Sequence, residues 1–190
     1  MISLNEFLER MDHEFECSSE IRVGREGYKT DTGRGIKNYL KIQGLKSVDY
    51  YEVHDNKGLL FVEFSDLFWE KSDIDTRLDA LESCDLCDEY KRATLSELKK
   101  RIHQGLASKF KDSHTLKDIV INKFTDVPLC FKEIGAYIVV VPPIRESVDT
   151  EKYQSLIRFL SILESKIKGA IPNDIYTNVR VLPLDRFIAA

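Results

Sequence analysis

Residues 48–66 carry the pattern of a β-hairpin, and any fold of this chain has to accommodate it. Two runs rich in valine, tyrosine, phenylalanine and leucine flank the tetrapeptide Asp55-Asn56-Lys57-Gly58. This tetrapeptide suits a type I turn in which Gly58 takes a left-handed conformation and forms a bulge. The sequence therefore predicts two neighbouring antiparallel strands.

The turn also predicts a register for the hairpin. With Asp55 paired to Leu59, Asp49 is expected to lie opposite Ser65. Because side chains alternate between the faces of a strand, Asp49, Glu63 and Ser65 then share one face, and the residues between them point to the other. Two carboxylates on adjacent strands make this face a candidate site.

The rest of the chain alternates between helical and strand patterns. A capping pair, Ser3 and Glu6, precedes apolar residues at helical spacing and predicts a first helix over residues 3–17. Further helices are expected within 67–90, over 91–111 and over 150–168, and further strands over 37–43, 119–124, 136–141 and 178–182. The order predicts an α/β fold, in which a central mixed sheet with an N-terminal antiparallel hairpin is flanked by helices. We expect one domain over 1–190, with a helical insertion at about 67–90.

Composition narrows the class of protein. The chain is 43% apolar and 32% charged, as in ordinary globular proteins, and it has no apolar run of the length that a membrane span needs. Its N-terminus lacks the apolar region of a signal peptide, so a cytoplasmic location is the default expectation. Four cysteines in such a protein predict reduced thiols or a metal site rather than a disulfide framework.

A basic segment interrupts a chain whose net charge is −4. Residues 21–48 contain seven basic residues and only two acidic ones. One interpretation is a surface for nucleic acid or an acidic partner, and the other is a solvated loop and strand face. The candidate binding residues are Arg22, Arg25, Lys29, Arg34, Lys37 and Lys41.

The cysteines allow a second kind of site. His13 and Cys17 are four residues apart in the first expected helix, and Cys84 and Cys87 form a CxxC pair. Together they have the ligand types of a Cys₃His zinc site. The alternative is core packing with an exposed thiol, which is common for a CxxC inside a helical stripe.

The order of elements, with Asp49 on one strand and Glu63 on the next, resembles the restriction-endonuclease-like PD-(D/E)xK nuclease family. The resemblance implies that Asp49 and Glu63 hold Mg²⁺ beside a scissile phosphate, where hard oxygen ligands are needed. In that family a lysine two residues after the glutamate helps to activate the attacking water, but Ser65 stands there in this chain. Valine also precedes Asp49, where the family usually has proline.

A serine cannot supply the missing positive charge, so a lysine from elsewhere would have to replace it. The candidates are Lys71, Lys91, Lys100 and the lysines of the 21–48 segment, and Glu14 or Glu20 could complete a metal shell.

Two functions follow from this resemblance. The chain is expected to be an accessory or interaction protein of an immunity, defence or DNA-processing complex, with a protein partner and reduced catalytic competence. The alternative is an active Mg²⁺-dependent nuclease that cleaves DNA or RNA.

Overall fold

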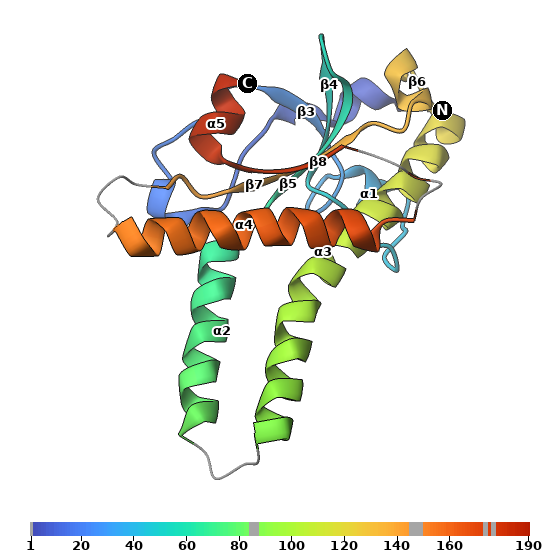
Figure 1. Ribbon diagram of the computed structural model, residues 1–190. Coiled ribbons are helices and arrows are strands. Elements are labelled where there is room, and N and C mark those ends of the chain that lie inside the picture. Colours follow the sequence, from blue (N-terminus) through green and yellow to red (C-terminus); the bar gives the residue numbers. More distant parts are fainter. Residues whose placement is uncertain (1, 84–87, 145–149, 173–174, 176–177) are drawn as a thin grey trace.

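The structure is a computed structural model that describes residues 2–83, 88–144, 150–172, 175 and 178–190 (Figure 1). Its strands are β1 Ile2–Ser3, β2 Leu8–Arg10, β3 Glu26–Lys29, β4 Tyr50–His54, β5 Gly58–Phe64, β6 Phe124–Thr125, β7 Ala136–Val141 and β8 Val179–Pro183. The α-helices are α1 Ile36–Tyr39, α2 Leu67–Glu82, α3 Asp88–Lys123, α4 Thr150–Ala170 and α5 Leu184–Ala189, and short 3₁₀ turns lie at Leu4–Phe7, Glu16–Ser18 and Leu129–Lys132.

A six-stranded mixed sheet forms the centre, in the order β2-β3-β4-β5-β7-β8. The strands from β2 to β5 are antiparallel to their neighbours, whereas β5, β7 and β8 run parallel. Parallel neighbours need a crossover connection, and the helices α3 and α4 provide the two crossovers. The expected mixed α/β architecture is confirmed.

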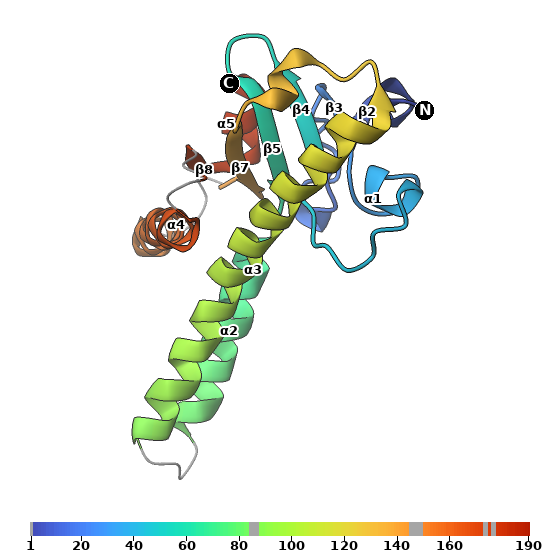
Figure 2. The ribbon, with the colours of Figure 1, turned by 90° about the vertical axis from the view of Figure 1, so that its right-hand side faces the viewer.

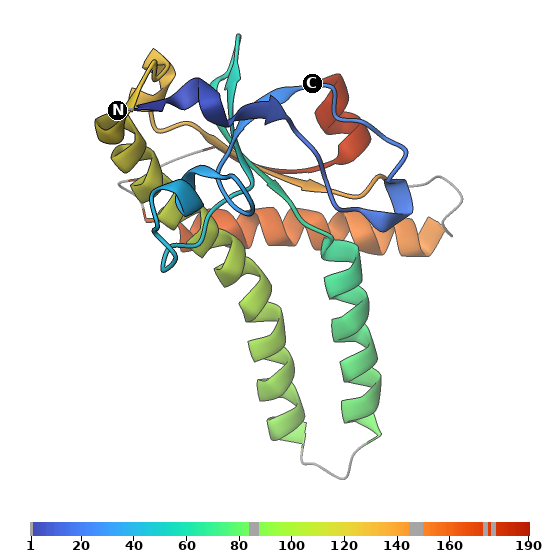
Figure 3. The same cartoon turned by 180° about the vertical axis from the view of Figure 1, so that it is seen from behind.

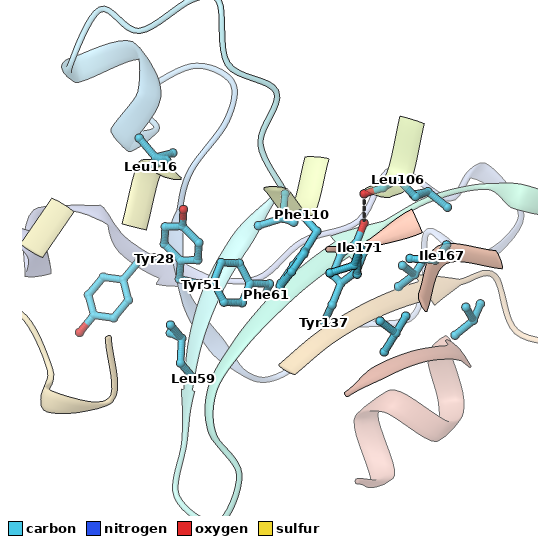
Figure 4. Packing of buried hydrophobic residues seen from close by; sticks show 14 of the residues in the cluster. Tyr28, Tyr51, Leu59, Phe61, Leu106, Phe110, Leu116, Tyr137, Ile167 and Ile171 are labelled. Atoms are coloured by element: carbon cyan, nitrogen blue, oxygen red, sulfur yellow. Dashed lines mark hydrogen bonds between the residues drawn. The ribbon is translucent and has the colours of Figure 1, made fainter. Parts of the chain in front are cut away.

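The two faces of the sheet build two hydrophobic clusters. Tyr51, Phe61 and Tyr137 point to the face covered by α3 and α4, where their rings pack with Phe110 of α3 (Figure 4). The alternate residues of the same strands point to the opposite face, against α5 and the N-terminal segment. This alternation follows from the period of two in a strand, and it decides which side chains of the hairpin can face α3.

The predicted hairpin is confirmed, but its register differs from the expected one by two residues. The Lys57 N–H donates to His54 O, and Gly58 follows this turn with φ +69°. His54 pairs with Gly58, so the turn is centred one residue earlier than the sequence suggested. A shift of two residues leaves every side chain on its predicted face and changes only its cross-strand neighbour.

The helix expected over residues 3–17 is wrong. Only a 3₁₀ turn at Leu4–Phe7 follows Ser3, and the chain then extends to pair β2 with β3. Met11, His13 and Phe15 are buried and alternate with exposed residues. Phe7, Met11 and Phe15 are spaced by four, which fits a helix and an extended chain equally well, and here the pairing with β3 decides the outcome.

Two short strand predictions are also wrong, while the longer elements are confirmed. Residues 37–43 contain α1, and α3 continues through 119–123 before the short strand β6. The strands predicted at 136–141 and 178–182 and the helix predicted at 150–168 correspond to β7, β8 and α4. The β7 strand is buried on both faces, as its uninterrupted apolar run predicts.

A helical arm projects from the sheet. It consists of α2 and residues 88–105 of α3, and it leaves the body where β5 ends (Figures 1, 2 and 3). Both predicted helices of this region are present. None of the helices in the described ranges combines the length and apolar character that crossing a bilayer requires.

A buried ion pair holds the C-terminal helix to the sheet. The Arg25 Nε atom donates to Glu52 Oε1 at 2.8 Å, and its Nη1 atom donates to the Phe187 carbonyl oxygen at 2.6 Å.

We expect Arg25→Met to lower the free energy of unfolding by about 3 kcal/mol, because it leaves a charge on Glu52 buried without its partner. Arg22→Met is the control: Arg22 is 79% exposed and lies 3.9 Å from Asp12, so its loss should cost less than about 0.5 kcal/mol. Urea unfolding checks both, and equal losses would contradict the prediction.

Candidate functional site

Asp49 and Glu63 lie at the end of the hairpin from which the arm projects. Continuing the observed register by one residue places Asp49 opposite Glu63, rather than opposite Ser65 as predicted. The Asp49 Oδ2 atom accepts a hydrogen bond from the Phe64 N–H at 2.7 Å, which fixes the orientation of this carboxylate. Glu63 is 2% exposed. The hairpin therefore brings two carboxyl groups together in a largely buried position.

A lysine that the motif comparison did not suggest completes this group. Lys109 of α3 places its Nζ atom 2.5 Å from Glu63 Oε1. The crossover from β5 to β7 lays α3 over the face of the sheet to which Glu63 points, and this brings Lys109 to the hairpin although 46 residues separate the two in sequence. A cation thus reaches the carboxylates from a different element.

The three lysines suggested in its place lie elsewhere. Lys71 pairs with Asp75 at 2.5 Å, and Lys100 lies 3.9 Å from Glu97. Lys100 and Lys91 precede Lys109 by nine and 18 residues on α3, which corresponds to about 13 and 27 Å along the helix axis. Among the lysines of the 21–48 segment, Lys37 and Lys46 line a pocket together with Glu63.

Burial raises the pKa of both carboxyl groups. Burial, followed by the charge of Asp49, raises the pKa of Glu63 from 4.5 to about 8, although Lys109 opposes the shift. Burial also raises the pKa of Asp49, against the Phe64 N–H and Lys109. Burial alone would lower the pKa of Lys109, but the charge and hydrogen bond of Glu63, together with the charges of Asp49 and Asp31, outweigh burial and raise that pKa. Lys109 therefore stays charged, while Glu63 is poised to exchange a proton near neutral pH.

One oxygen of this group has no partner. Glu63 Oε1 accepts from Lys109, whereas Glu63 Oε2 is buried without a hydrogen-bond partner among the described residues. A buried acceptor of this kind is costly unless something else satisfies it. The orphaned oxygen marks the position at which a cation or a proton would complete the site.

One further ion pair and one further carboxyl group lie next to these residues. Asp31 lies 2.7 Å from Lys37 Nζ. Burial would raise the pKa of Asp31. Together with the nearby positive charges, hydrogen bonds donated by the Lys37 side chain and by the Thr32 N–H outweigh burial and lower this pKa below its usual value. Burial raises the pKa of Glu70, at the start of α2, against the charge of Lys109. The sequence analysis did not identify Asp31, Glu70 or Lys109 as members of this site.

Two pockets share Lys109 and Asp31 in their linings. The first pocket has a volume of about 430 Å³ and contains Glu63, Ser65 and Lys37 in its lining. Ser65, at the position of the family's lysine, thus faces the site. The second pocket, of about 470 Å³, has these residues in its lining besides the shared two: Asp12, His13, Glu14, Phe15, Lys29, Thr32, Asp49, Tyr50, Phe64 and Asp66.

Of the two extra carboxylates considered from the sequence, Glu14 lies near the site. It lines the second pocket, and its charge contributes to the raised pKa of Asp49. Glu14 comes from an extended segment rather than from the helix expected there. Glu20 is exposed and lines neither pocket.

The predicted basic surface is divided among several places. Four of its six residues lie within 4 Å of an acidic partner: Arg22 with Asp12, Arg25 with Glu52, Lys29 with Glu9, and Lys37 with Asp31. Arg34 and Lys41 are exposed. Arg25 makes its contacts inside the protein. Of the six residues, only Lys37 lines the pocket that contains Glu63.

The zinc hypothesis loses its geometric basis at the N-terminus. His13 and Cys17 do not share a helix, because residues 3–17 are mostly extended. His13 Nε2 lies 3.0 Å from the Ile21 carbonyl oxygen, and His13 Nδ1 accepts from the Phe15 N–H, so both ring nitrogens contact the backbone. Cys84 and Cys87 lie outside the described residues.

The residue types at the hairpin suit Mg²⁺ rather than a softer metal. Within the described ranges, no group of three or more histidine, cysteine, aspartate and glutamate side chains is arranged to hold a metal ion. Magnesium, however, commonly takes one or two protein carboxylates and fills its remaining positions with water and substrate phosphate. Asp49 and the unpartnered oxygen of Glu63 fit that requirement.

Comparison of the chain with protein-family models, with curated proteins and with solved structures finds no match.

Proposed function

We propose that this chain is a Mg²⁺-dependent phosphodiesterase acting on nucleic acid, on a scaffold that resembles the restriction-endonuclease-like fold. The observation that carries the proposal is the contact of Lys109 with Glu63 beside Asp49. It supplies, from α3, the positive charge that Ser65 cannot provide. The order β3-β4-β5-β7, with a helical crossover before β7, also agrees with the resemblance noted in the sequence.

Each residue has a role in this proposal. Asp49 and Glu63 would hold Mg²⁺, which would polarise the phosphate and supply an activated water. The Phe64 N–H keeps the Asp49 carboxylate oriented. Lys109 stays protonated and offsets the negative charge that builds up on the phosphate during hydrolysis.

A second candidate function is that of an accessory or interaction protein on the same scaffold, in an immunity, defence or DNA-processing complex. Two observations favour it. The Lys109 ammonium group occupies an oxygen that a metal ion would also use, and the net charge of −4 is unfavourable for a protein held on nucleic acid chiefly by phosphate contacts. In this case the carboxylates and Lys109 form a structural ion-pair group.

A hydrolysis assay separates the two functions. The purified protein with Mg²⁺ or Mn²⁺ should cleave labelled DNA or RNA oligonucleotides, and Glu63→Gln should reduce product formation to background because a metal ligand is lost. The matched control is Glu26→Gln, which changes an exposed glutamate of β3 in the same sheet. Mg²⁺ should also raise the unfolding temperature of the wild type but not of Glu63→Gln.

The opposite results would support the accessory function. No cleavage and no metal-dependent shift in the wild type would exclude the hydrolase. Cleavage that persists in Glu63→Gln would show that the activity comes from another site or another protein.

A further inference from the structure

The pocket beside Glu63 has the form of a groove between two segments. Residues 43–47 form one wall, and the opposite wall is a face of α3 on which Arg101, Gly105 and Lys109 follow one another at intervals of four. Glu70, near the start of α2, and Glu63 lie in the same lining. The groove thus extends from the carboxylates along the base of the arm.

The side chains of two cations in this groove form no ion pair among the described residues, although the Lys46 backbone N–H donates to Asp112 Oδ2 at 2.9 Å. Lys46 and Arg101 are both exposed, and each belongs to a different wall. The other two lysines of the groove, Lys37 and Lys109, are paired with Asp31 and Glu63. Lys46 and Arg101 are therefore free to bind an anion that enters the groove.

Both walls also contain a glycine beside open space. A Cβ atom added to Gly105 or to Gly44 would meet no other atom within 4 Å. Gly105 stands inside α3, where glycine is a poor helix former, and close packing does not explain it. The absence of a side chain at both positions keeps the groove wide enough for a chain to enter.

We propose that this groove binds one strand of single-stranded nucleic acid, with a phosphate between Lys46 and Arg101 and the neighbouring phosphate at Glu63. Placing the second phosphate at Glu63 rests on the proposed hydrolytic function, whereas binding of the strand does not. A single strand fits because Glu63 is 2% exposed and lies between the 43–47 segment, α2 and α3. A duplex presents its phosphates on the outside of a rigid cylinder, and these walls would hold that cylinder away from Glu63.

The second pocket adjoins the groove at Lys109 and Asp31, and its lining includes the rings of Phe15, Tyr50 and Phe64. Its lining is otherwise acidic, with five carboxylates against Lys29 and Lys109. In this proposal the pocket therefore receives bases, which stack on aromatic rings, and the phosphates stay at Lys46 and Arg101.

Fluorescence anisotropy in EDTA tests binding without hydrolysis. The probes are a fluorescein-labelled 12-nucleotide DNA, the RNA of the same sequence, and a duplex of that sequence closed by hairpin loops at both ends. We expect at least one of the single strands to bind at least tenfold more tightly than the closed duplex. The double variant Lys46→Ala/Arg101→Ala should weaken this binding at least tenfold and reduce its salt dependence, because two phosphate contacts are lost.

Two matched pairs of variants locate the strand. Gly105→Phe should block the groove, whereas Gly169→Phe, at a helical glycine of α4 that also faces open space, should leave binding unchanged. Lys100→Ala, next to Arg101 but outside the groove lining, should also bind like the wild type. Thermal unfolding of each variant checks that it is folded.

The outcomes separate this inference from the proposed function. Single-strand binding that depends on the groove, without hydrolysis in Mg²⁺, supports the inference and overturns the hydrolase. Hydrolysis of the closed duplex that neither Gly105→Phe nor the double variant slows supports the hydrolase and overturns the inference. Absence of both binding and hydrolysis overturns both.

Discussion

Lys109→Met is expected to lower the rate of metal-dependent hydrolysis by about 10²–10³-fold, which is the usual cost of losing one group that stabilises charge in a transition state. Methionine keeps most of the volume of the lysine stem but removes the ammonium group that lies 2.5 Å from Glu63. Lys109→Arg should retain part of the rate, because it keeps the charge but not the geometry of a compact ammonium group.

Lys111→Met provides the control for this prediction, because Lys111 lies on the same helix but lines neither pocket. Initial rates at saturating Mg²⁺ are the measurement. If Lys109→Met cleaved at the wild-type rate while Glu63→Gln did not, Lys109 would be only a structural partner of Glu63.

The second large effect concerns pH and the stability of the metal-free protein. The pKa of Glu63 is raised from 4.5 to about 8 in the folded protein by burial and by the charge of Asp49. A raised pKa means that the folded state favours the protonated carboxyl group. Its contribution to stability is therefore fully present below pH 4.5 and is lost as the pH rises through 8, by an amount on the order of 5 kcal/mol.

We expect Glu63→Gln to remove this pH dependence. The wild type should lose more unfolding free energy between pH 5.5 and 8.5 than the variant does, and Glu63→Gln should be the more stable protein at pH 8.5. Urea unfolding of both proteins in EDTA at the two pH values measures the difference. Subtracting the two pH dependences removes the contributions of groups that titrate alike in both proteins. Parallel pH profiles would contradict the prediction.

Added Mg²⁺ gives this measurement a second readout. At pH 8.5 it should stabilise the wild type, because a cation bound to Asp49 and Glu63 replaces the proton that burial favours. The same addition should have little effect on Glu63→Gln.

The sequence predicted the hairpin and the common face of its carboxylates, though not their pairing, because those features depend on local rules. Turn residues and the period of two place Asp49 and Glu63 on one face, and an error of two residues in the register leaves that face unchanged. The central architecture followed from the order of strongly patterned elements such as β7 and α4.

The lysine of the site could not be found in this way, because it depends on how α3 crosses the sheet. A signal was present: Lys109 lies between Leu106 and Phe110, on the border of the buried stripe of that helix. The spacing marks it as a partly buried cation, but only the packing of α3 over β5 shows which carboxylate it meets. The helix prediction for the N-terminal segment was wrong for a related reason. Pairing of β2 with β3 overrides a spacing of apolar residues that also fits a helix.

The helix that carries Lys109 is continuous over 36 residues, from the end of the arm to β6. A helix of this length is a rod of about 54 Å. Lys109 lies on this same helix, about 13 Å along its axis from Lys100 in the arm. A partner that bound the arm and displaced the whole helix would therefore also move the ammonium group relative to the carboxylates, without touching either of them.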